Sequence, residues 1–203
     1  MNSVAVDAVV RRGDFSLRLQ LELAAGETVA LIGPIGTGKS TALGLISGAI
    51  GADEGQVVGP DQLWDDPAAG IWVAAAQRSV SHLRQRPSLI DDVAAIDQVK
   101  AATTSNARLI LAELGLTEGV YSREGWTLSG GETQRVALAA AVAVPAHIIL
   151  LDDPFAALDT RTGALVRAWL AERLARRVQS TVLACSDPAD AARFADRVIE
   201  LGS

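Results

Sequence analysis

The chain has 203 residues, of which 49% are hydrophobic and 21% charged, and its formal net charge at pH 7 is −6. This length suits one large domain or one domain with an inserted lobe, and a negative charge without a basic stripe argues against nucleic-acid binding. The single cysteine, Cys185, excludes an internal disulfide. The sequence also lacks the run of about 18 uncharged apolar residues that a membrane-spanning helix needs, so any role at a membrane would come through a partner.

The first predicted elements form an antiparallel layer. Residues 15–23 read FSLRLQLEL, in which apolar and polar side chains alternate. Such alternation is typical of a strand with one buried and one solvated face, which antiparallel sheets provide. Residues 4–10 are the expected partner strand, and Gly13-Asp14 is the expected turn between the two.

Short apolar runs later in the chain follow a different pattern. The runs are TVALI at 28–32, IILL at 148–151 and TVLA at 181–184. Continuous runs of this length are typical of strands buried on both faces of a parallel sheet. The helical stretches that follow them are 40–47, 160–177 and 188–195. Strand-then-helix repetition predicts an α/β fold with a mostly parallel core sheet and right-handed crossovers.

Residues 87–127 differ from the rest of the chain. They contain a helical stretch at 105–114, with Gly115 as its expected stop, and they lack a buried-strand run. We expect a short helical lobe here, inserted into an α/β core made of 1–86 and 128–203, so that 1–203 is a single domain. A last strand is expected at 198–201, and because the sequence ends just after it, no appended domain is expected.

The strongest chemical signal is a phosphate-binding loop. Residues 33–41 read GPIGTGKST, which fits the pattern G-x-x-x-x-G-K-[ST] between an apolar strand and a helix. Main-chain N–H groups of such a loop curl around phosphates, and the helix N-terminus adds a favourable dipole. Lys39 would contact the β- and γ-phosphates, and the Ser40 hydroxyl would bind Mg²⁺. The predicted ATP-binding residues here are Gly33, Pro34, Ile35, Gly36, Thr37, Gly38, Lys39, Ser40 and Thr41.

Two further strings belong with this loop. HIILLDD at 147–153 is a buried strand ending in acid, and Asp152 would hold Mg²⁺, through water. LSGGETQR at 128–135 predicts a helix N-terminus with two glycines and a hydroxyl, which suits an anion. The same string reads as a capping box formed by Ser129 and Glu132, and both readings can hold because the cap builds the anion site.

With these strings in this order, the chain resembles an ATP-binding subunit of an ABC transporter over nearly all its length, and it is more loosely similar to the ATPases of molybdate-type importers. The resemblance implies an ATPase that uses ATP and Mg²⁺ in a head-to-tail homodimer or heterodimer with a second ABC ATPase subunit. The residues expected to close on the partner's ATP are Ser129, Gly130, Gly131 and Glu132. The turn Ala157-Leu158-Asp159 would touch the partner subunit. The resemblance also implies membrane permease subunits, and hence a cytoplasmic location at the inner face of the cell membrane.

The family places a glutamine at a strand end, where it senses Mg²⁺ and the attacking water. Two residues are candidates for it: Gln77, after IWVAAA, and Gln85, after SVSHLR. The continuation Gln85-Arg86-Pro87-Ser88-Leu89 better resembles the family's Q-x-P-x-L, so Gln85 is favoured for this catalytic and metal-sensing role.

Three departures from the family pattern bear on catalysis. Asp153 stands where the family has the glutamate that polarises the attacking water, and Ser186 stands where it has a histidine. Arg12 stands near the place of the aromatic that stacks on adenine, while Phe15 alternates as a core residue. We therefore expect slow hydrolysis in an importer subunit. The alternatives are a degenerate module that acts as an ATP-binding switch and, ranked last, an ABC protein without a permease.

Overall fold

The computed structural model describes residues 4–202 and divides them into two compact units. The sheet unit comprises 4–82, 146–152 and 177–202, and the helical unit comprises 83–145 and 153–176. Among the described residues, the structure contains no helix that combines the length and the apolar character needed to cross a bilayer.

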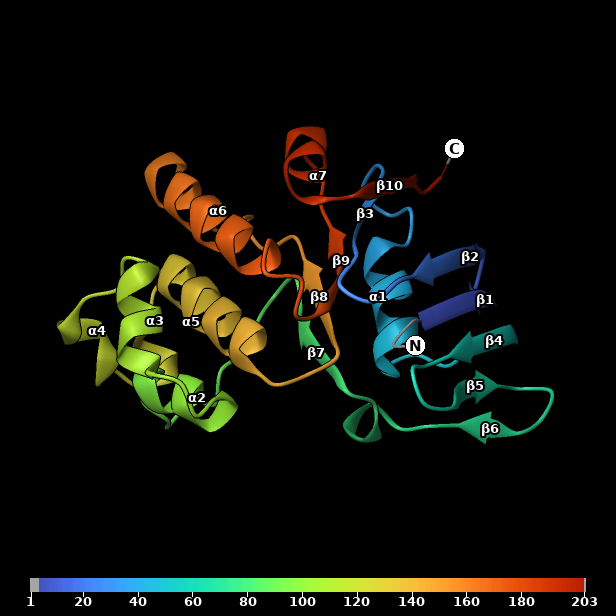
Figure 1. The fold of residues 1–203 in the computed structure, drawn as a ribbon, viewed down its shortest axis with the longest axis horizontal. Helices are drawn as coiled ribbons and strands as arrows, with labels where there is room; N and C mark the ends of the chain where they lie inside the picture. The colour runs from blue at the N-terminus through green and yellow to red at the C-terminus, as the bar shows by residue number, and fades with distance from the viewer. Residues whose placement is uncertain (1–3, 203) are drawn as a thin grey trace. The chain divides into compact units, whose positions relative to one another are not determined.

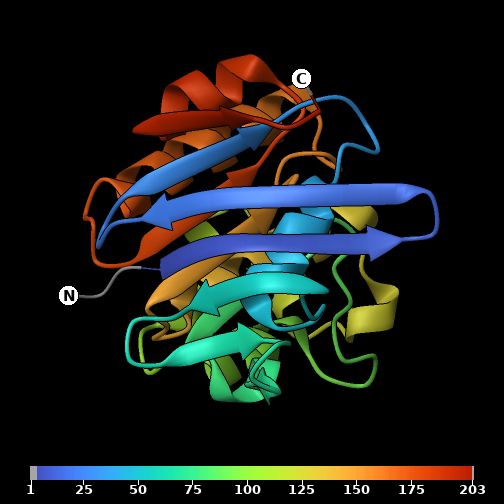
Figure 2. The same ribbon diagram turned by 90° about the vertical axis from the view of Figure 1, so that its right-hand side faces the viewer.

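The sheet unit contains the predicted antiparallel layer, seen face-on in Figure 2. Its strands, in the order β2-β1-β4-β5-β6, are β2 (Phe15–Leu23), β1 (Val4–Arg12), β4 (Glu54–Val58), β5 (Leu63–Asp66) and β6 (Ile71–Trp72). β1 and β2 pair from Val4↔Leu23 to Arg12↔Phe15, so the predicted turn at Gly13-Asp14 is confirmed. The turn needs the glycine, because Gly13 has a φ of +57°. The leucines of β2 are buried and its polar residues exposed, as the alternation predicted.

A second sheet in this unit is the predicted parallel one. Its strands, in the order β10-β3-β9-β8-β7, are β10 (Arg197–Glu200), β3 (Thr28–Ile32), β9 (Ser180–Ala184), β8 (Ile148–Asp152) and β7 (Val80–Leu83). β3 pairs in parallel with β10 and β9, and β9 with β8. β8 and β9 are buried along their whole length, as expected for strands covered on both faces.

Helix α1 (Lys39–Ser47) packs between the two sheets, against β2 on one side and β8 and β9 on the other (Figure 1). The apolar residues of β1, β2, α1 and the parallel strands form one core there. Helix α7 (Pro188–Phe194) packs on β3, and its first turn is capped by Asp187, which accepts from the Ala189 N–H at 2.9 Å. The short 3₁₀ helix η1 (Ala75–Gln77) precedes β7.

The helical unit carries the remaining helices. They are α2 (Ala95–Ala102), α3 (Ala107–Glu113), α4 (Glu118–Tyr121), η2 (Gly125–Thr127), α5 (Gly130–Ala143) and α6 (Thr160–Leu174). α2 and α3 pack on α5, and Glu113 of α3 accepts from Trp169 Nε1 of α6 at 2.9 Å. α2, α3 and α4 fall within 87–127, whose status as a separate lobe remains a prediction.

Two predicted helix limits are wrong. The helix expected at 160–177 ends at Leu174, because Arg177 has a φ of +51°, which a continuing helix does not allow. The helix expected at 105–114 begins at Ala107, because the side chain of Asn106 accepts from the Leu109 N–H at 3.2 Å and so caps the first turn.

Candidate functional site

The phosphate loop runs from the end of β3 to the start of α1. Gly38 is the N-cap residue of α1 with a φ of +98°. A Cβ atom at this position would lie 2.7 Å from Cζ of Phe15, so both the backbone angle and the space require glycine. Phe15, at the tip of the β1–β2 turn, therefore packs directly against the loop, and its partial burial agrees with the core role expected for it.

Lys39 lies within the loop rather than pointing away from it. Its side chain is only 7% exposed, and Nζ donates to the carbonyl oxygens of Gly33 at 2.6 Å and Pro34 at 3.0 Å. An ammonium group has three N–H donors, so the loop engages two of them. Ile35, at the outer bend of the loop, is 96% exposed. Lys39 thus places its ammonium group among the main-chain groups that would surround a phosphate.

The carboxyl edge of the parallel sheet brings acid and hydroxyl groups to the same place as this loop. Asp152 ends β8, is 4% exposed and pairs with Ala184, the last residue of β9. Ser186 follows two residues later and is exposed. Ligands of open α/β sheets bind outside the carboxyl ends of the strands.

This donor set fits a magnesium nucleotide. The Ser40 hydroxyl, exposed in the first turn of α1, and the Asp152 carboxylate are oxygen ligands of the kind Mg²⁺ prefers. Mg²⁺ in such sites takes one or two carboxylates together with phosphate oxygens and water. The described residues contain no cluster of three or more His, Cys, Asp or Glu side chains able to hold a metal. A site of this composition suits a metal that arrives with a phosphate.

In the helical unit, Gln85 lies beside Asp153. Gln85 follows β7, and its Nε2 donates to Oδ2 of Asp153 at 3.3 Å. Asp153 has a φ of +45°, and among non-glycine residues Asp and Asn tolerate this left-handed conformation best. Gln77 ends η1 in the sheet unit and is exposed. Of the two candidate glutamines, Gln85 is the one that lies two residues after a strand and contacts Asp153.

The predicted signature loop is the N-terminus of α5. Ser129 is its N-cap residue, and Glu132 completes a capping box: the Ser129 N–H donates to Oε2 of Glu132 at 2.8 Å, and the Glu132 N–H donates to Oγ of Ser129 at 3.4 Å. Partial burial raises the pKa of the Glu132 carboxyl, but hydrogen bonding from Ser129 and the positive charges of Arg123 and Arg135 outweigh it, so the pKa lies below its ordinary value. Gly130 and Gly131 form the first helical turn, and a Cβ atom added at Gly130 would meet open space.

The turn 157–159 ends in a helix cap. Asp159 accepts from the N–H groups of Arg161 and Thr162, both at 3.0 Å, and so begins α6. These hydrogen bonds lower the pKa of the Asp159 carboxyl, and those from Thr162 have the largest effect. The preceding segment is fixed by buried Gln134 of α5, which donates to the Pro154 carbonyl at 2.9 Å.

Sequence reasoning missed two arginines. Arg78 is 4% exposed, and its guanidinium donates to the carbonyls of Leu45 and Ile46 at the end of α1 and to those of Val73 and Trp64. Arg123 binds Glu132 in the signature loop. No hydrophobic periodicity in the sequence marks Arg78 as buried. For Arg123, the sequence offered one signal: a cation nine residues before Glu132, the glutamate of the capping box. Arg12, near the expected adenine position, donates to Asp53 Oδ2 at 3.3 Å.

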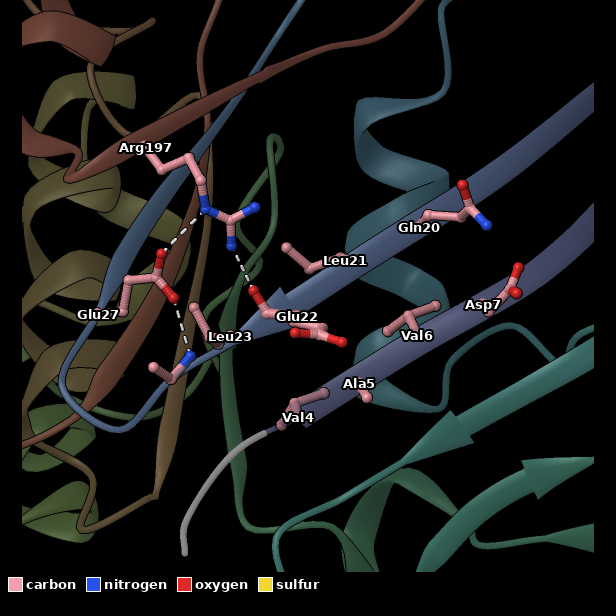
Figure 3. A pocket seen from close by; sticks show the side chains of 11 residues that line it. Val4, Ala5, Val6, Asp7, Gln20, Leu21, Glu22, Leu23, Glu27 and Arg197 are labelled. Carbon is pink, nitrogen blue, oxygen red and sulfur yellow. Dashed lines mark hydrogen bonds and ion pairs between the residues drawn. The ribbon is translucent and has the colours of Figure 1, made fainter.

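An open groove lies elsewhere in the sheet unit, along the start of β1 and the end of β2 (Figure 3). Arg197, at the start of β10, donates to Oε1 of Glu27 at 3.1 Å and to the main-chain oxygen of Glu22. Glu27 also accepts from the Ala24 N–H at 2.8 Å. Glu27 precedes β3, so this groove is at the amino ends of the strands and is separate from the phosphate loop.

Comparison with known proteins agrees with this geometry. The family described as "ABC transporter" matches residues 17–156. The molybdenum import ATP-binding protein ModC of Mycobacterium tuberculosis is 35% identical over 100% of this chain and 58% of its own length. That of Albidiferax ferrireducens is 34% identical over 98% and 56%. The aliphatic sulfonates import ATP-binding protein SsuB 3 of Rhodococcus jostii is 38% identical over 90% and 64%. The chain thus spans a little over half the length of these relatives.

Solved structures give the same result. A dimeric bacterial ABC transporter cassette, MJ0796, superposes with a TM-score of 0.79 at 26% identity, covering 98% of this chain and 94% of that one. A second structure of this cassette, a dimer in a post-hydrolysis state with ADP and phosphate, gives 0.78. The fold and the phosphate loop define a P-loop ATP-binding domain. The chain belongs to the ABC transporter family, as the order of its motifs predicted.

Proposed function

We propose that the chain is the ATP-binding subunit of an ABC importer. It binds Mg-ATP through 33–41 and Asp152, and it pairs head to tail with a second ABC ATPase subunit. Ser129, Gly130, Gly131 and Glu132 of each subunit close on the other's γ-phosphate. The observation that carries the proposal is Lys39, held among the loop carbonyls of Gly33 and Pro34 at the carboxyl edge of the parallel sheet.

The import role rests on relatives whose names describe import of molybdenum, sulfonates and sulfate or thiosulfate. A membrane permease is the proposed partner, with the lobe 87–127 and Gln85 linking it to the nucleotide. The subunit would then lie in the cytoplasm, peripheral to the inner face of the membrane. The solute is selected by other subunits.

A second candidate is an ATP-binding switch with little hydrolysis. Asp153 favours it, because a shorter carboxylate on a left-handed backbone, engaged by Gln85, takes the place of the family's glutamate. Binding does not need that residue, since Lys39, Ser40 and Asp152 are all present. Both candidates predict ATP-driven pairing, and they differ in turnover.

The test is light scattering of the protein with ATP and Mg²⁺, compared with Ser129→Arg. The wild type should dimerise, and turnover should be slow enough for the dimer to persist. The variant should stay monomeric while it keeps its ATP affinity, because the bulk lies at the partner's nucleotide. Wild-type protein that remains monomeric at every ATP concentration contradicts a homodimer. Copurification with an integral membrane protein from the native host tests the permease.

A further inference from the structure

Arg123 contacts the signature loop at Glu132 and the residue just before the loop, Thr127. Nη1 of Arg123 contacts both carboxylate oxygens of Glu132, at 3.0 and 3.2 Å, and Nη2 donates to the main-chain oxygen of Thr127. Thr127 precedes the loop and Glu132 lies in the first turn of α5. The Glu132 side chain is 16% exposed and that of Arg123 37%, so the pair is screened by solvent less than an open surface pair.

Arg123 is itself fixed by main-chain hydrogen bonds. Its carbonyl accepts from the Ala95 N–H at 2.9 Å, and the Gly125 N–H donates to the Val93 carbonyl at 3.1 Å. Ala94 and Glu124 form an antiparallel bridge between these bonds. The arginine therefore projects from a short paired segment, and its position does not depend on the ion pair alone.

Glu132 poses an electrostatic problem for the function proposed above. Its ionised carboxylate lies in the first turn of α5, where the anionic γ-phosphate of a partner's ATP would approach. Two negative charges repel each other, more strongly at a half-buried site than in bulk water. A second cation, Arg135, lies nearby, but its guanidinium donates to the carbonyls of Gly131, Leu114 and Gly115.

We propose that Arg123 is a positioning residue of the nucleotide sandwich: it neutralises the Glu132 carboxylate, so that the N-terminus of α5 can accept the partner's phosphate. The inference rests on the proposed function, because it requires ATP bound between two subunits. Arg123 acts through Glu132 and need not touch the nucleotide.

The experiment measures dimer dissociation constants by analytical ultracentrifugation with Mg²⁺ and a non-hydrolysable ATP analogue. Arg123→Gln should raise the constant roughly tenfold or more, because two equivalent sites in each dimer gain a like-charge repulsion. Glu132→Gln removes the repelling charge while glutamine keeps the capping box, and it is the second single variant that the cycle needs. The double variant Arg123→Gln/Glu132→Gln should return to within about threefold of the wild type, a rescue that neutralisation predicts and loop support through Thr127 does not. Calorimetry should find monomer affinity for the analogue unchanged in all variants.

Arg108→Gln is the matched control, because Arg108 pairs with Glu118 in the same unit with both side chains exposed; it should dimerise as the wild type does. Thermal unfolding shows whether each variant is folded. Wild-type strength in Arg123→Gln, or a double variant as weak as Arg123→Gln, would overturn the inference and leave the proposed function standing. A wild type that does not dimerise with the analogue would overturn the inference for a homodimer, together with the proposed homodimer itself.

Discussion

Nε2 of Gln85 donates to Oδ2 of Asp153 over 3.3 Å, so two residues for which the sequence predicted catalytic roles are in contact. The two residues are 68 positions apart in the chain. Several variants can test whether this contact serves hydrolysis.

We predict that the wild type hydrolyses ATP at less than ~1 s⁻¹, the lower end of the usual enzyme range. Asp153 draws the charge back by one carbon, and Ser186 lacks an imidazole donor; a misplacement of about 1 Å alone can cost on the order of 100-fold. Steady-state phosphate release should rise at least about tenfold in the double variant Asp153→Glu/Ser186→His, with smaller gains in each single variant.

The control for this prediction is Asp92→Glu, which makes the same change at an exposed position. Wild-type turnover of ~1 s⁻¹ or faster, with no gain in the double variant, would show that Asp153 already reaches the water. Asp153→Glu should also lower the free energy of unfolding by up to about 1 kcal/mol, because glutamate tolerates the left-handed conformation less well than aspartate.

Gln85→Ala should reduce hydrolysis while sparing ATP affinity, because it removes the donor to Asp153 and leaves the phosphate loop intact. Gln77→Ala is the matched control, since Gln77 is the other candidate glutamine and lies exposed at the end of η1. Phosphate release and calorimetry on both variants measure the two effects. A large loss of turnover in Gln77→Ala with none in Gln85→Ala would reverse the assignment.

Lys39→Ala should weaken ATP binding by roughly 10- to 100-fold, the effect of losing hydrogen bonds from a charged donor. Calorimetry compares it with Lys100→Ala, which removes an ammonium that is exposed and paired with Asp97. Equal ATP affinities in the two variants would remove Lys39 from the phosphate site.

Arg78→Met should destabilise the sheet unit by about 3 kcal/mol or more, because buried carbonyls lose a charged donor. Four carbonyls are involved, two of them at the end of α1. Arg78→Lys should recover part of the loss, since one ammonium cannot reach all four. Urea unfolding measures both; equal stability of the methionine variant and the wild type would contradict this account.

Stability should fall in acid through Asp196. Bonds from Arg177, at 3.0 Å, and from the Thr28 N–H lower the pKa of this carboxyl below its ordinary value of 3.8. A lowered folded pKa means that the ionised carboxylate stabilises the fold above the unfolded value and that this contribution is lost as pH falls through the folded one. Asp196→Asn should cost about 1 kcal/mol at pH 7, discounted for exposure, and the difference should vanish near pH 3 or below. Urea midpoints across this range test it, and a difference that persists in acid contradicts it.

The sequence predicted the β1–β2 pair, the buried parallel strands and the phosphate loop because each has a strong local signal: alternation, an apolar run or a glycine pattern. β5 was not predicted because two acids, Asp65 and Asp66, look like loop residues. Both are buried, where Asp65 accepts from the Ala52 N–H at 2.9 Å and Asp66 from Gln56 Nε2 at 2.7 Å. Contacts between distant parts of the chain make those acids compatible with a strand, and a local pattern does not contain them. The same holds for Arg78 and for the amide contact of Asp153.

The burial of Cys185 has a practical consequence for spectroscopy. This sulfur is the only one in the chain that belongs to a thiol, and its residue is 2% exposed, directly before Ser186. A thiol reagent at neutral pH should therefore label a cysteine introduced at an exposed position far faster than the native one. Ile35, 96% exposed on the phosphate loop, is such a position. A fluorophore attached there would report nucleotide arrival in a protein that needs no background cysteine removed.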